Sequence, residues 1–564
     1  MPLKHLLIKL WGLVAIGIAV SSIPAVAQNN NTRNSPIIQT KKGTVRGSVT
    51  ANHIQQFLGI PYAKAPTGKL RWMPPQEMEP WKGIKNATEF SNACPQVTTL
   101  GPFAGPTTVN EDCLYLNVFT TGETRSLKPV IVWIHGGGNF AGSSADYDPT
   151  PLVQGQPDGQ ETVVVTFNYR LGLFGTLSTP SLNSEGHPWG NYGVLDQLAV
   201  LKWVKQNIAK FGGDPDRVTL GGQSAGAYDT VANMLSPLSE GLFNRAIVMS
   251  SPGFAAGFPT ANTALHNGTA FAKAAGCEVN DANCLRSLSA ARILQLQGAP
   301  NMNSAFITGT PFVDGTIIPQ QPAVAWQTGS FNKMPVMGGS TEDEASFFTG
   351  VTEYYSAPLF YGPSWKSMDI ESFNQSMKPG SFCLWCNNNQ IPNGALKHYS
   401  LSQHQDDPME AYQRLLTDIA KCQEQNVLRE WVTQVPVYAY DFTYNDAPFY
   451  FPQMPGFKPG ASHTADIQFV FKNFHGGQLG VNIDQKTGIP RELNSQEQQL
   501  ADQMVGMWTR FAATGNPNGS GDQPWPRMRS IKDGHYYIQD VNATTMSSQK
   551  YRQKYQCDYW NSKH

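Results

Sequence analysis

The chain has 564 residues and a formal net charge of −1, with 15% charged residues, 52 glycines and 40 prolines. This near-neutral balance excludes the basic surface that nucleic acid requires and a strong field for anionic membranes, so we expect neither partner. The low charge and the many turn-forming residues exclude coiled-coil and disordered classes and are typical of a loop-rich enzyme.

The first residues have the pattern of a targeting segment. Two lysines precede an apolar run at residues 10–20, and Ala25–Ala27 is a small-residue cleavage site. The pattern predicts a secretory signal peptide over residues 1–27, followed by a mature domain over residues 28–564 that is secreted or periplasmic. A membrane anchor is the alternative, but the apolar run is shorter than the ~20 residues of a membrane span. No later segment is long enough, so we expect no stable membrane insertion.

The sequence contains eight cysteines. An exported chain meets an oxidising compartment, where an even number of cysteines favours disulfides. Proximity in the sequence suggests that Cys94 pairs with Cys113 and Cys277 with Cys284.

The other four cysteines form one close pair and one distant pair. Cys383 and Cys386 form a Cys-x-x-Cys motif, for which a redox role and a metal site are alternatives. No strand–helix redox turn surrounds the motif and no second Cys-x-x-Cys accompanies it, so we interpret it as a structural disulfide and expect no metal. Cys422 and Cys557 remain, and their pairing would tie the C-terminus to the body of the protein.

Secondary structure is indicated by the spacing of apolar residues. Short apolar runs rich in β-branched residues predict buried parallel strands at residues 130–134, 162–167, 218–220 and 246–249. Apolar residues three and four apart predict helices over residues 195–208 and 500–511. Alternating strands and helices predict an α/β fold with a mostly parallel central sheet flanked by helices. The long middle, about 252–459, is interpreted as loop and helical insertions on this sheet.

A serine motif directly follows the strand at 218–220. Residues 222–226 read Gly-Gln-Ser-Ala-Gly, and a helical segment comes next. In a strand–turn–helix context, Gly-x-Ser-x-Gly places the serine on a strained turn that lifts its hydroxyl above the sheet. The bare motif arises by chance in a glycine-rich chain, so the context carries the prediction that Ser224 is a nucleophile.

A glycine run follows the strand at 130–134. His135 is followed by three glycines, which would serve either as a plain turn or as an oxyanion hole. Residues without side chains let backbone N–H groups bind a developing negative oxygen, and losing one such donor costs about 3 kcal/mol of transition-state stabilisation. We predict that Gly137 and Gly138 are donors, together with the amide of Ala225. The order of this loop and the serine motif is that of lipases and esterases.

A serine nucleophile also needs a base and an acid that orients it, and in this fold both follow the serine. The downstream histidines are His266, His398, His404, His463, His475, His535 and His564. The candidate acids include Asp314, Glu342, Asp343 and Glu344. Position alone does not choose among them.

Several motifs along the mature chain resemble those of the type-B carboxylesterase and cholinesterase family. They are residues 57–63 (Phe-Leu-Gly-Ile-Pro-Tyr-Ala), 111–117 (Glu-Asp-Cys-Leu-Tyr-Leu-Asn), 168–172 (Asn-Tyr-Arg-Leu-Gly) and 211–215 (Phe-Gly-Gly-Asp-Pro). The resemblance implies that the acid is Glu344, in the segment 341–348, and that the base is His463, in the segment 462–471. It also implies the three cysteine pairs other than Cys383–Cys386, which has no counterpart in the family.

Two departures from the family bear on the substrate. The family's usual motif is Gly-Glu-Ser-Ala-Gly, whereas Gln223 stands in the place of the glutamate. Cholinesterases also carry a tryptophan in the first disulfide loop, on which a quaternary ammonium stacks. The segment 94–113 contains no tryptophan, and Phe103 is its only aromatic residue. Both departures disfavour choline esters.

The sequence therefore predicts a serine carboxylic ester hydrolase that forms an acyl-enzyme, with a small-molecule ester as substrate and no cofactor. A lipase, an amide-cleaving hydrolase and, less favoured, an inactive adhesion protein on the same fold are the alternatives. Aromatic residues of the middle region would line a hydrophobic gorge or belong to the core, and we expect core for most of them. These residues are Phe347, Phe348, Tyr354, Tyr355 and Trp365.

Overall fold

The computed structural model describes residues 35–96, 108–122, 126–155, 157–251, 257–297, 309–356, 367–383, 385–386, 389–451, 453–454, 456–472, 474, 482–530, 532 and 534–563. The chain divides into two units, Met1–Ser35 and Pro36–His564, and all described helices and strands belong to the second. The predicted signal peptide lies outside the described residues, as do Phe103, Trp365, His475 and His564 and the side chains of Tyr354 and Tyr355.

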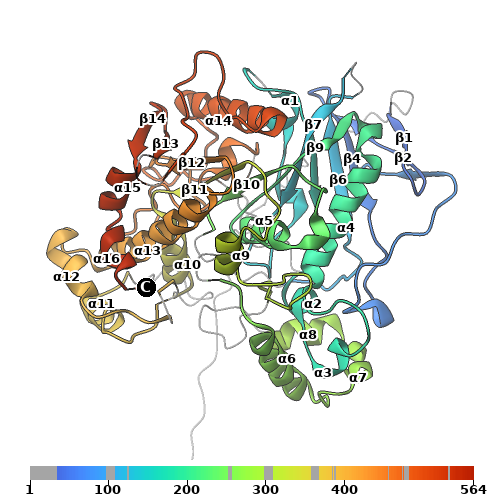
Figure 1. Ribbon diagram of the computed structural model, residues 1–564, viewed down its shortest axis with the longest axis horizontal. Helices are drawn as coiled ribbons and strands as arrows, with labels where there is room; N and C mark the ends of the chain where they lie inside the picture. Colours follow the sequence, from blue (N-terminus) through green and yellow to red (C-terminus); the bar gives the residue numbers. More distant parts are fainter. Residues whose placement is uncertain are drawn as a thin grey trace, which may run out of the picture. The chain divides into compact units, whose positions relative to one another are not determined.

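The described part of the second unit is organised around an eleven-stranded sheet (Figure 1). Its order is β14-β13-β12-β11-β10-β9-β7-β8-β6-β4-β3. All neighbours from β13 to β8 pair in parallel, whereas β14 at one side and β6, β4 and β3 at the other pair antiparallel. This arrangement confirms the predicted α/β fold with a mostly parallel sheet.

The strands have the following bounds. In the large sheet they are β3 (Ser48–Val49), β4 (Gln55–Pro61), β6 (Tyr115–Thr120), β7 (Lys128–Ile134), β8 (Val163–Phe167), β9 (Gly213–Gln223), β10 (Arg245–Met249), β11 (Val336–Thr341), β12 (Val437–Phe442), β13 (His535–Gln539) and β14 (Thr544–Ser547). A separate small sheet has the order β1 (Ile37–Gln39), β2 (Thr44–Arg46) and β5 (Ile84–Asn86).

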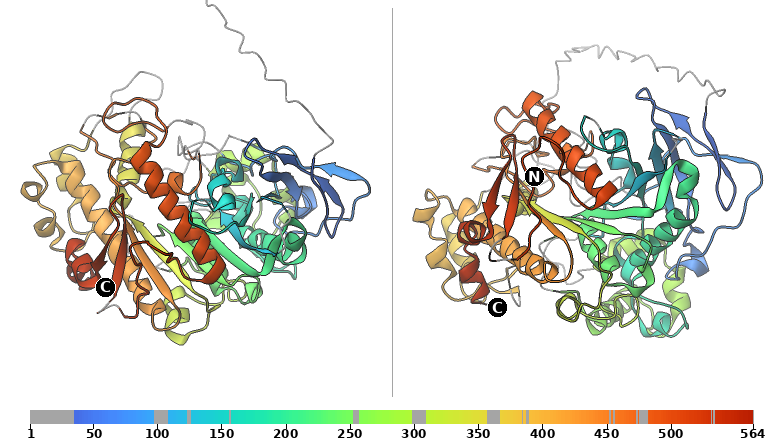
Figure 2. Two further views of the ribbon diagram at one scale, coloured as in Figure 1. Left: turned by 90° about the horizontal axis from the view of Figure 1, so that it is seen from above. Right: turned by 45° about the horizontal axis from the view of Figure 1, so that its top comes forward.

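Helices lie on both faces of the large sheet. They are α1 (Thr150–Gln154), α2 (Gly172–Thr176), α3 (Pro180–Asn183), α4 (Tyr192–Asn207), α5 (Ala225–Leu235), α6 (Ala261–Ala275), α7 (Ala282–Ser287), α8 (Ala290–Gln297), α9 (Pro322–Thr328), α10 (Glu344–Ser356), α11 (Ile370–Ser376), α12 (Ala395–His398), α13 (Pro408–Trp431), α14 (Ser495–Thr514), α15 (Ser548–Lys554) and α16 (Cys557–Asn561). Helices α4, α5 and α13 contribute to one core cluster and α1 and α14 to the other, and Figure 2 shows α14 lying along the sheet. In the described part of the chain, no helix is long and apolar enough to cross a membrane.

Side chains of each central strand alternate between two cores. In β7, Val130 and Val132 belong to the first core cluster, whereas Ile131 and Trp133 belong to the second. Every residue of β7 is buried, because helices cover both faces. This explains why the strand reads as a continuous apolar run rather than an alternating one.

The predicted elements appear close to their expected positions, with one correction. The four predicted strands form parts of β7, β8, β9 and β10, and the two predicted helices correspond to α4 and α14. The middle region is not composed only of insertions, because it contributes β11 and β12 to the large sheet. Strand β11 reads Val-Met-Gly-Gly-Ser-Thr, and its two glycines interrupt the apolar run by which a buried strand is recognised.

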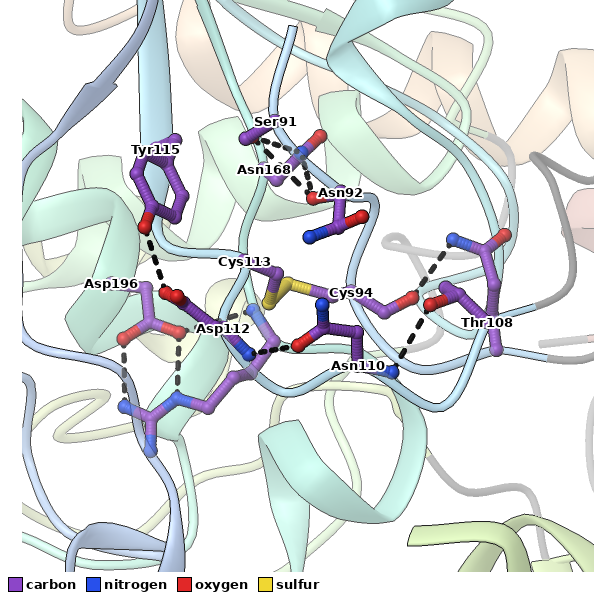
Figure 3. Close-up of a disulfide and its surroundings, with 12 residues drawn as sticks. Ser91, Asn92, Cys94, Thr108, Asn110, Asp112, Cys113, Tyr115, Asn168 and Asp196 are labelled. Carbon is purple, nitrogen blue, oxygen red and sulfur yellow. Dashed lines mark hydrogen bonds and ion pairs between the residues drawn. A yellow bond between two sulfur atoms is a disulfide. The ribbon is translucent and has the colours of Figure 1, made fainter.

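Several family motifs act as scaffolding at the first disulfide and nearby. Arg170 pairs with the buried Asp196 of α4 through two hydrogen bonds of 2.8 and 2.7 Å. Figure 3 shows the Cys94–Cys113 disulfide beside a series of turn hydrogen bonds from Thr108 to Tyr115. On its other side, Asn168 donates to the carbonyl of Asn92 at 3.0 Å. Buried ion pairs and amide contacts of this kind fix the loops, because an unpaired buried polar group would be costly.

All four predicted disulfides are present. They join Cys94 to Cys113, Cys277 to Cys284, Cys383 to Cys386 and Cys422 to Cys557. The Cys422–Cys557 disulfide connects α13 with the first residue of α16, so the C-terminal helix α16 is covalently linked to α13.

Candidate active site

Ser224 occupies the turn between β9 and α5. Its backbone adopts φ 57° and ψ −123°, a conformation rare for residues other than glycine. The turn is held from both sides, because the Ser224 N–H donates to the carbonyl of Met249 at 2.9 Å and its own carbonyl accepts the Tyr228 N–H at 3.0 Å. The residue is half-buried between a buried Gln223 and a buried Ala225, which leaves the serine accessible at the end of the strand.

The glycines on either side of this turn are required by close backbone approach. A Cβ atom on Gly226 would lie 2.0 Å from the carbonyl oxygen of Ile134 in β7. A Cβ atom on Gly222 would lie 2.3 Å from the carbonyl carbon of Gly226. Any side chain at either position would therefore push the serine turn away from the neighbouring strand.

Glu344 and His463 lie side by side although 119 positions separate them in the sequence. The His463 Nδ1 atom is 2.5 Å from Glu344 Oε2, and the two side chains are 2% and 0% exposed. Glu344 begins α10 directly after β11, whereas His463 lies in the loop after β12. The two loops are joined through Asp343, whose N–H donates to the carbonyl of Ala461 at 3.0 Å and whose carboxylate accepts the Ala461 N–H at 3.0 Å.

The surroundings of Glu344 keep it ionised. Burial alone would raise its pKa, but the charge and hydrogen bond of His463, the Lys421 cation and the Ser250 hydroxyl together lower the pKa to about 2. Its Oε1 atom accepts hydrogen bonds from the Ser250 hydroxyl at 2.5 Å and from the Thr341 N–H at 2.9 Å. A carboxylate with this many donors stays charged at neutral pH and can stabilise a positive imidazole.

Lys421 supplies a positive charge behind the Glu344–His463 pair. Its side chain is fully buried in α13, 2.5 Å from Asp441 and 3.0 Å from the Ser340 hydroxyl. Burial alone would lower the pKa of Lys421, but Asp441 and Glu424 outweigh burial and raise it. Burial raises the pKa of Glu424 to about 8 even with Lys421 beside it, so Glu424 is mostly protonated at neutral pH. The Lys421 ammonium is therefore paired with the Asp441 carboxylate, and its charge also acts on Glu344.

The second nitrogen of His463 faces the serine turn. The Gln223 amide nitrogen lies 3.2 Å from His463 Nε2, and Gln223 is the residue directly before Ser224. Within the described residues, the Ser224 hydroxyl itself makes no hydrogen bond to His463. Serine–histidine contacts are often long before substrate binds, so this arrangement brings the imidazole of His463 to the serine turn without a direct contact.

The glycine run after β7 forms an open loop beside the serine turn. Gly137 and Gly138 have φ values of 105° and 65°, and Gly137 lies so close to Ala141 that an added Cβ would meet its carbonyl oxygen at 2.2 Å. Gly137 is half-buried and Gly138 is exposed. Among the described residues, the N–H groups of Gly137, Gly138 and Ala225 donate no hydrogen bond, so they are available to a substrate oxygen.

A buried polar network fixes the base of this loop. The His135 ring stacks on Tyr169 with centroids 4.5 Å apart, and the Tyr169 hydroxyl donates to the carbonyl of His135 at 2.9 Å. Asn139 donates to Asp229 of α5 at 2.9 Å, which connects the loop to the helix that follows Ser224. Burial lowers the pKa of His135 to about 4, so this histidine is neutral and acts as a support for the loop.

The other candidate acids and bases have different surroundings. Asp314 caps a turn by accepting the N–H groups of Thr316 and Ile317, and Asp343 joins the two loops as described. His398 stacks on Tyr559 with centroids 3.9 Å apart. In the described part of the chain, His463 is thus the histidine that contacts a candidate acid beside the serine turn.

Reasoning from sequence missed two residues of this site and one contact of a third. Ser250 and Lys421 contact or face Glu344, and Gln223 contacts His463 in addition to its place in the serine motif. Ser250 directly follows the predicted strand at 246–249, and residues after parallel strands meet at one edge of the sheet, so it carried a detectable signal. Lys421 carried none, because a lysine on a helix is usually exposed. His, Cys, Asp and Glu side chains of the described residues form no cluster of three that could hold a metal.

A mostly parallel sheet, a strained serine at a strand–helix turn and a buried glutamate–histidine pair define the α/β-hydrolase class of serine hydrolases. The chain belongs to the carboxylesterase family, whose sequence model matches residues 34–560, and it is a serine hydrolase of carboxylic esters. It is 31% identical to carboxylesterase 1E of Rattus norvegicus, with 92% of each chain covered. It is 32% identical to the pyrethroid hydrolase Ces2a of Mus musculus, with 87% of this chain and 86% of that chain covered.

Solved structures agree with this assignment. A protein named PNB esterase is 29% identical and superposes with a TM-score of 0.71, covering 92% of this chain and 99% of its own.

Proposed function

We propose that the chain hydrolyses carboxylic esters through a covalent acyl-enzyme on Ser224, with His463 as general base and Glu344 as the acid that orients it. One observation carries this proposal: the buried 2.5 Å contact between Glu344 and His463 lies beside the strained turn that presents Ser224. The pair fixes the imidazole with Nδ1 toward Glu344, so Nε2 is left to accept the serine proton.

The first step forms the acyl-enzyme. The Ser224 oxygen attacks the ester carbonyl while its proton moves to His463 Nε2. Because Nε2 faces the Gln223 amide at 3.2 Å, that amide must give way as the serine hydroxyl turns toward the imidazole. The N–H groups of Gly137, Gly138 and Ala225 bind the negative oxygen of the tetrahedral intermediate. His463 then gives its proton to the leaving alcohol.

The second step releases the acid. Water enters, His463 removes its proton, and the resulting hydroxide attacks the acyl carbonyl. The intermediate collapses, the Ser224 oxygen leaves, and it recovers its proton from His463. The negative charge of Glu344 stabilises the imidazolium in both steps, and the side chains and water named here are sufficient for the reaction.

We also propose that the protein is exported and that its substrates are small uncharged esters. Four disulfides support an oxidising location, and the predicted signal peptide provides the route. The neutral Gln223 next to Ser224 favours an uncharged ester over a cationic one, because no carboxylate is supplied there.

Hydrolysis of p-nitrophenyl esters from acetate to palmitate, by the wild type and by Ser224→Ala, tests the proposal. We expect turnover of short esters by the wild type and loss of roughly 10⁴-fold or more in kcat for the variant. Mass spectrometry after treatment with a fluorophosphonate should locate the adduct on Ser224. Retention of activity by Ser224→Ala, or an adduct on another residue, would refute the assignment.

The same assay separates the alternative activities. Preference for palmitate presented as an emulsion would favour a lipase, and comparable rates on an ester and its matched p-nitroanilide would favour an amide-cleaving enzyme. Preference for short soluble esters over both supports the carboxylesterase proposal.

A further inference from the structure

The catalytic histidine is bordered by a chain of aromatic contacts that leads to the Cys-x-x-Cys loop. The ring of Phe348, in α10, lies 5.1 Å from the ring of His463. The ring of Trp385, which stands between Cys383 and Cys386, meets Phe348 edge to face at 5.0 Å with an interplanar angle of 89°. Edge-to-face packing at this distance is favourable beyond the burial of area, so the position of Trp385 is coupled to that of Phe348.

The backbone of Trp385 is fixed at several points. Trp385 lies inside the short loop that the Cys383–Cys386 disulfide closes, whose two cysteines are 3 positions apart in the sequence. The carbonyl oxygen of Trp385 accepts a hydrogen bond of 2.7 Å from the buried amide of Gln423 in α13. In addition, the Cys383 N–H donates to the carbonyl of Asn389 at 3.0 Å. These contacts anchor Trp385 through its carbonyl group and through the neighbouring Cys386.

Phe348 and Trp385 differ from core residues in their exposure to solvent. Phe347 also borders His463, at 5.9 Å, but it is buried, as expected for a core residue. Phe348 and Trp385 are only partly buried although both have large apolar rings. Phe348 lies beside His463 and Trp385 lies against Phe348, and partly exposed apolar rings next to a reacting group are typical of the lining of a ligand site.

Trp385 is held by contacts with two helices. Helices α10 and α13 pack against each other (Figure 1), and Trp385 contacts both, through its ring on Phe348 and through its carbonyl on Gln423. Glu344 begins α10 and Lys421 lies in α13, so the same two helices carry the acid and the ammonium behind it. A shift of the Trp385 ring would act first on Phe348, the ring that contacts His463.

We propose that Trp385 is a specificity-determining residue, held by the Cys383–Cys386 disulfide, whose ring limits the size of the apolar ester group that fits beside His463. The inference rests on the proposed function, because it assumes that esters react at Ser224 and His463. In this proposal the Cys383–Cys386 disulfide shapes the substrate pocket locally, whereas Cys422–Cys557 links the C-terminus to the rest of the fold.

The test compares kcat/KM on two series of esters. The first series is p-nitrophenyl acetate, butyrate and octanoate, which varies the acyl group. The second is ethyl, phenyl and 1-naphthyl acetate, which varies the alcohol. The variants are Trp385→Ala, Trp385→Phe and the double variant Cys383→Ser with Cys386→Ser.

We expect Trp385→Ala to raise the ratio of kcat/KM for the largest to the smallest ester by roughly tenfold or more in at least one series. The series that responds identifies the ester group that faces the indole. Trp385→Phe should restore the ratio to within about threefold of wild type, because it keeps an aromatic ring against Phe348. The double serine variant should move the ratio in the same direction as Trp385→Ala, by releasing the loop.

Matched controls separate a local from a general effect. Trp81→Ala removes another partly buried tryptophan, which lies beside β2 and donates to the carbonyl of Thr44. Replacing Cys277 and Cys284 by serine removes another short-range disulfide, whose described contacts do not include Phe348 or His463. Both controls should leave the ratios of kcat/KM at wild-type values.

The inference is overturned if the ratios of Trp385→Ala and of the double serine variant both stay within about twofold of wild type in both series. The double variant keeps the test decisive if Trp385→Ala does not fold, because it retains the indole. If Ser224→Ala hydrolyses the esters as fast as the wild type, the proposed function fails instead. Ser224-dependent hydrolysis with unchanged ratios refutes only the role of Trp385.

Discussion

Replacing Glu344 by glutamine tests the electrostatics of the site through protein stability. The folded environment lowers the pKa of Glu344 from 4.5 to about 2. A difference of about 2.5 pKa units corresponds to about 3 kcal/mol of stabilisation when the carboxyl is ionised in both states. Glutamine has nearly the same shape but no charge, so Glu344→Gln should lose this contribution at neutral pH.

The dependence on pH gives the sign of the effect. Because the pKa of Glu344 is lower in the folded protein than in the unfolded chain, its stabilisation is complete above the unfolded value of 4.5. It is lost as the pH falls through the folded value of about 2, and by pH 3 about 2 of the ~3 kcal/mol have gone. The difference in unfolding free energy between wild type and Glu344→Gln should therefore shrink by about 2 kcal/mol between pH 6 and pH 3.

Urea denaturation at pH 6, 5, 4 and 3 measures this difference, since carboxyl groups common to both proteins cancel. Glu371→Gln, which changes an exposed glutamate at the start of α11, is the matched control and should give a flat difference. A difference between wild type and Glu344→Gln that stays constant from pH 6 to pH 3 would refute the assignment of the lowered pKa. The activity of Glu344→Gln at pH 7 should fall roughly 10³- to 10⁴-fold, because the imidazole loses its orienting charge.

Three further changes probe the backbone, the buried charge and the covalent links. Gly226→Ala places a Cβ atom 2.0 Å from the carbonyl oxygen of Ile134. It should lower the unfolding free energy measured in urea by about 1–3 kcal/mol and abolish ester hydrolysis. Full activity would contradict the close approach. Lys421→Met removes the nearer of the two cations beside the buried Asp441 and leaves Lys554 at 3.7 Å. It should destabilise the fold by about 3 kcal/mol, part of which Asp441→Leu should restore in the double variant. A Lys421→Met variant as stable as wild type would contradict this. A disulfide stabilises more when it closes a longer loop. Removing Cys422–Cys557, which joins residues 135 positions apart, should therefore lower the unfolding free energy by about 5 kcal/mol, against about 2 kcal/mol for the Cys383–Cys386 disulfide. Equal losses would refute this reasoning.

The sequence by itself determined the elements whose patterns are local. The apolar run at 130–134 predicted a buried strand, and the glycines around Ser224 indicated a turn close to neighbouring backbone, as the structure has them. Helix α14 was predicted from its regular apolar spacing, and the structure adds a capping box of Asn494 and Glu497 at its start. Disulfide pairs close in sequence were also predictable, because short loops leave few alternatives.

Pairings between distant segments needed more than local patterns. Residues alone left several acids and histidines open, and the resemblance to the carboxylesterases selected Glu344 and His463. The structure places these two in contact across 119 positions, because the loops after the parallel strands β11 and β12 end at the same edge of the sheet. Strand β11 itself escaped prediction, since its glycines break the apolar run.

Only the tertiary structure decided which polar residues surround Glu344 and His463. Ser250, Lys421 and Gln223 are far apart in the sequence, and only for Ser250, which follows a predicted strand, did the sequence give a sign of its place near the site. Trp385 likewise acquires its place from a disulfide and from two helices that pack together. Local sequence encodes the periodicity of burial, whereas the partners of a buried charge or an exposed ring are chosen by the packing of segments far apart in the chain.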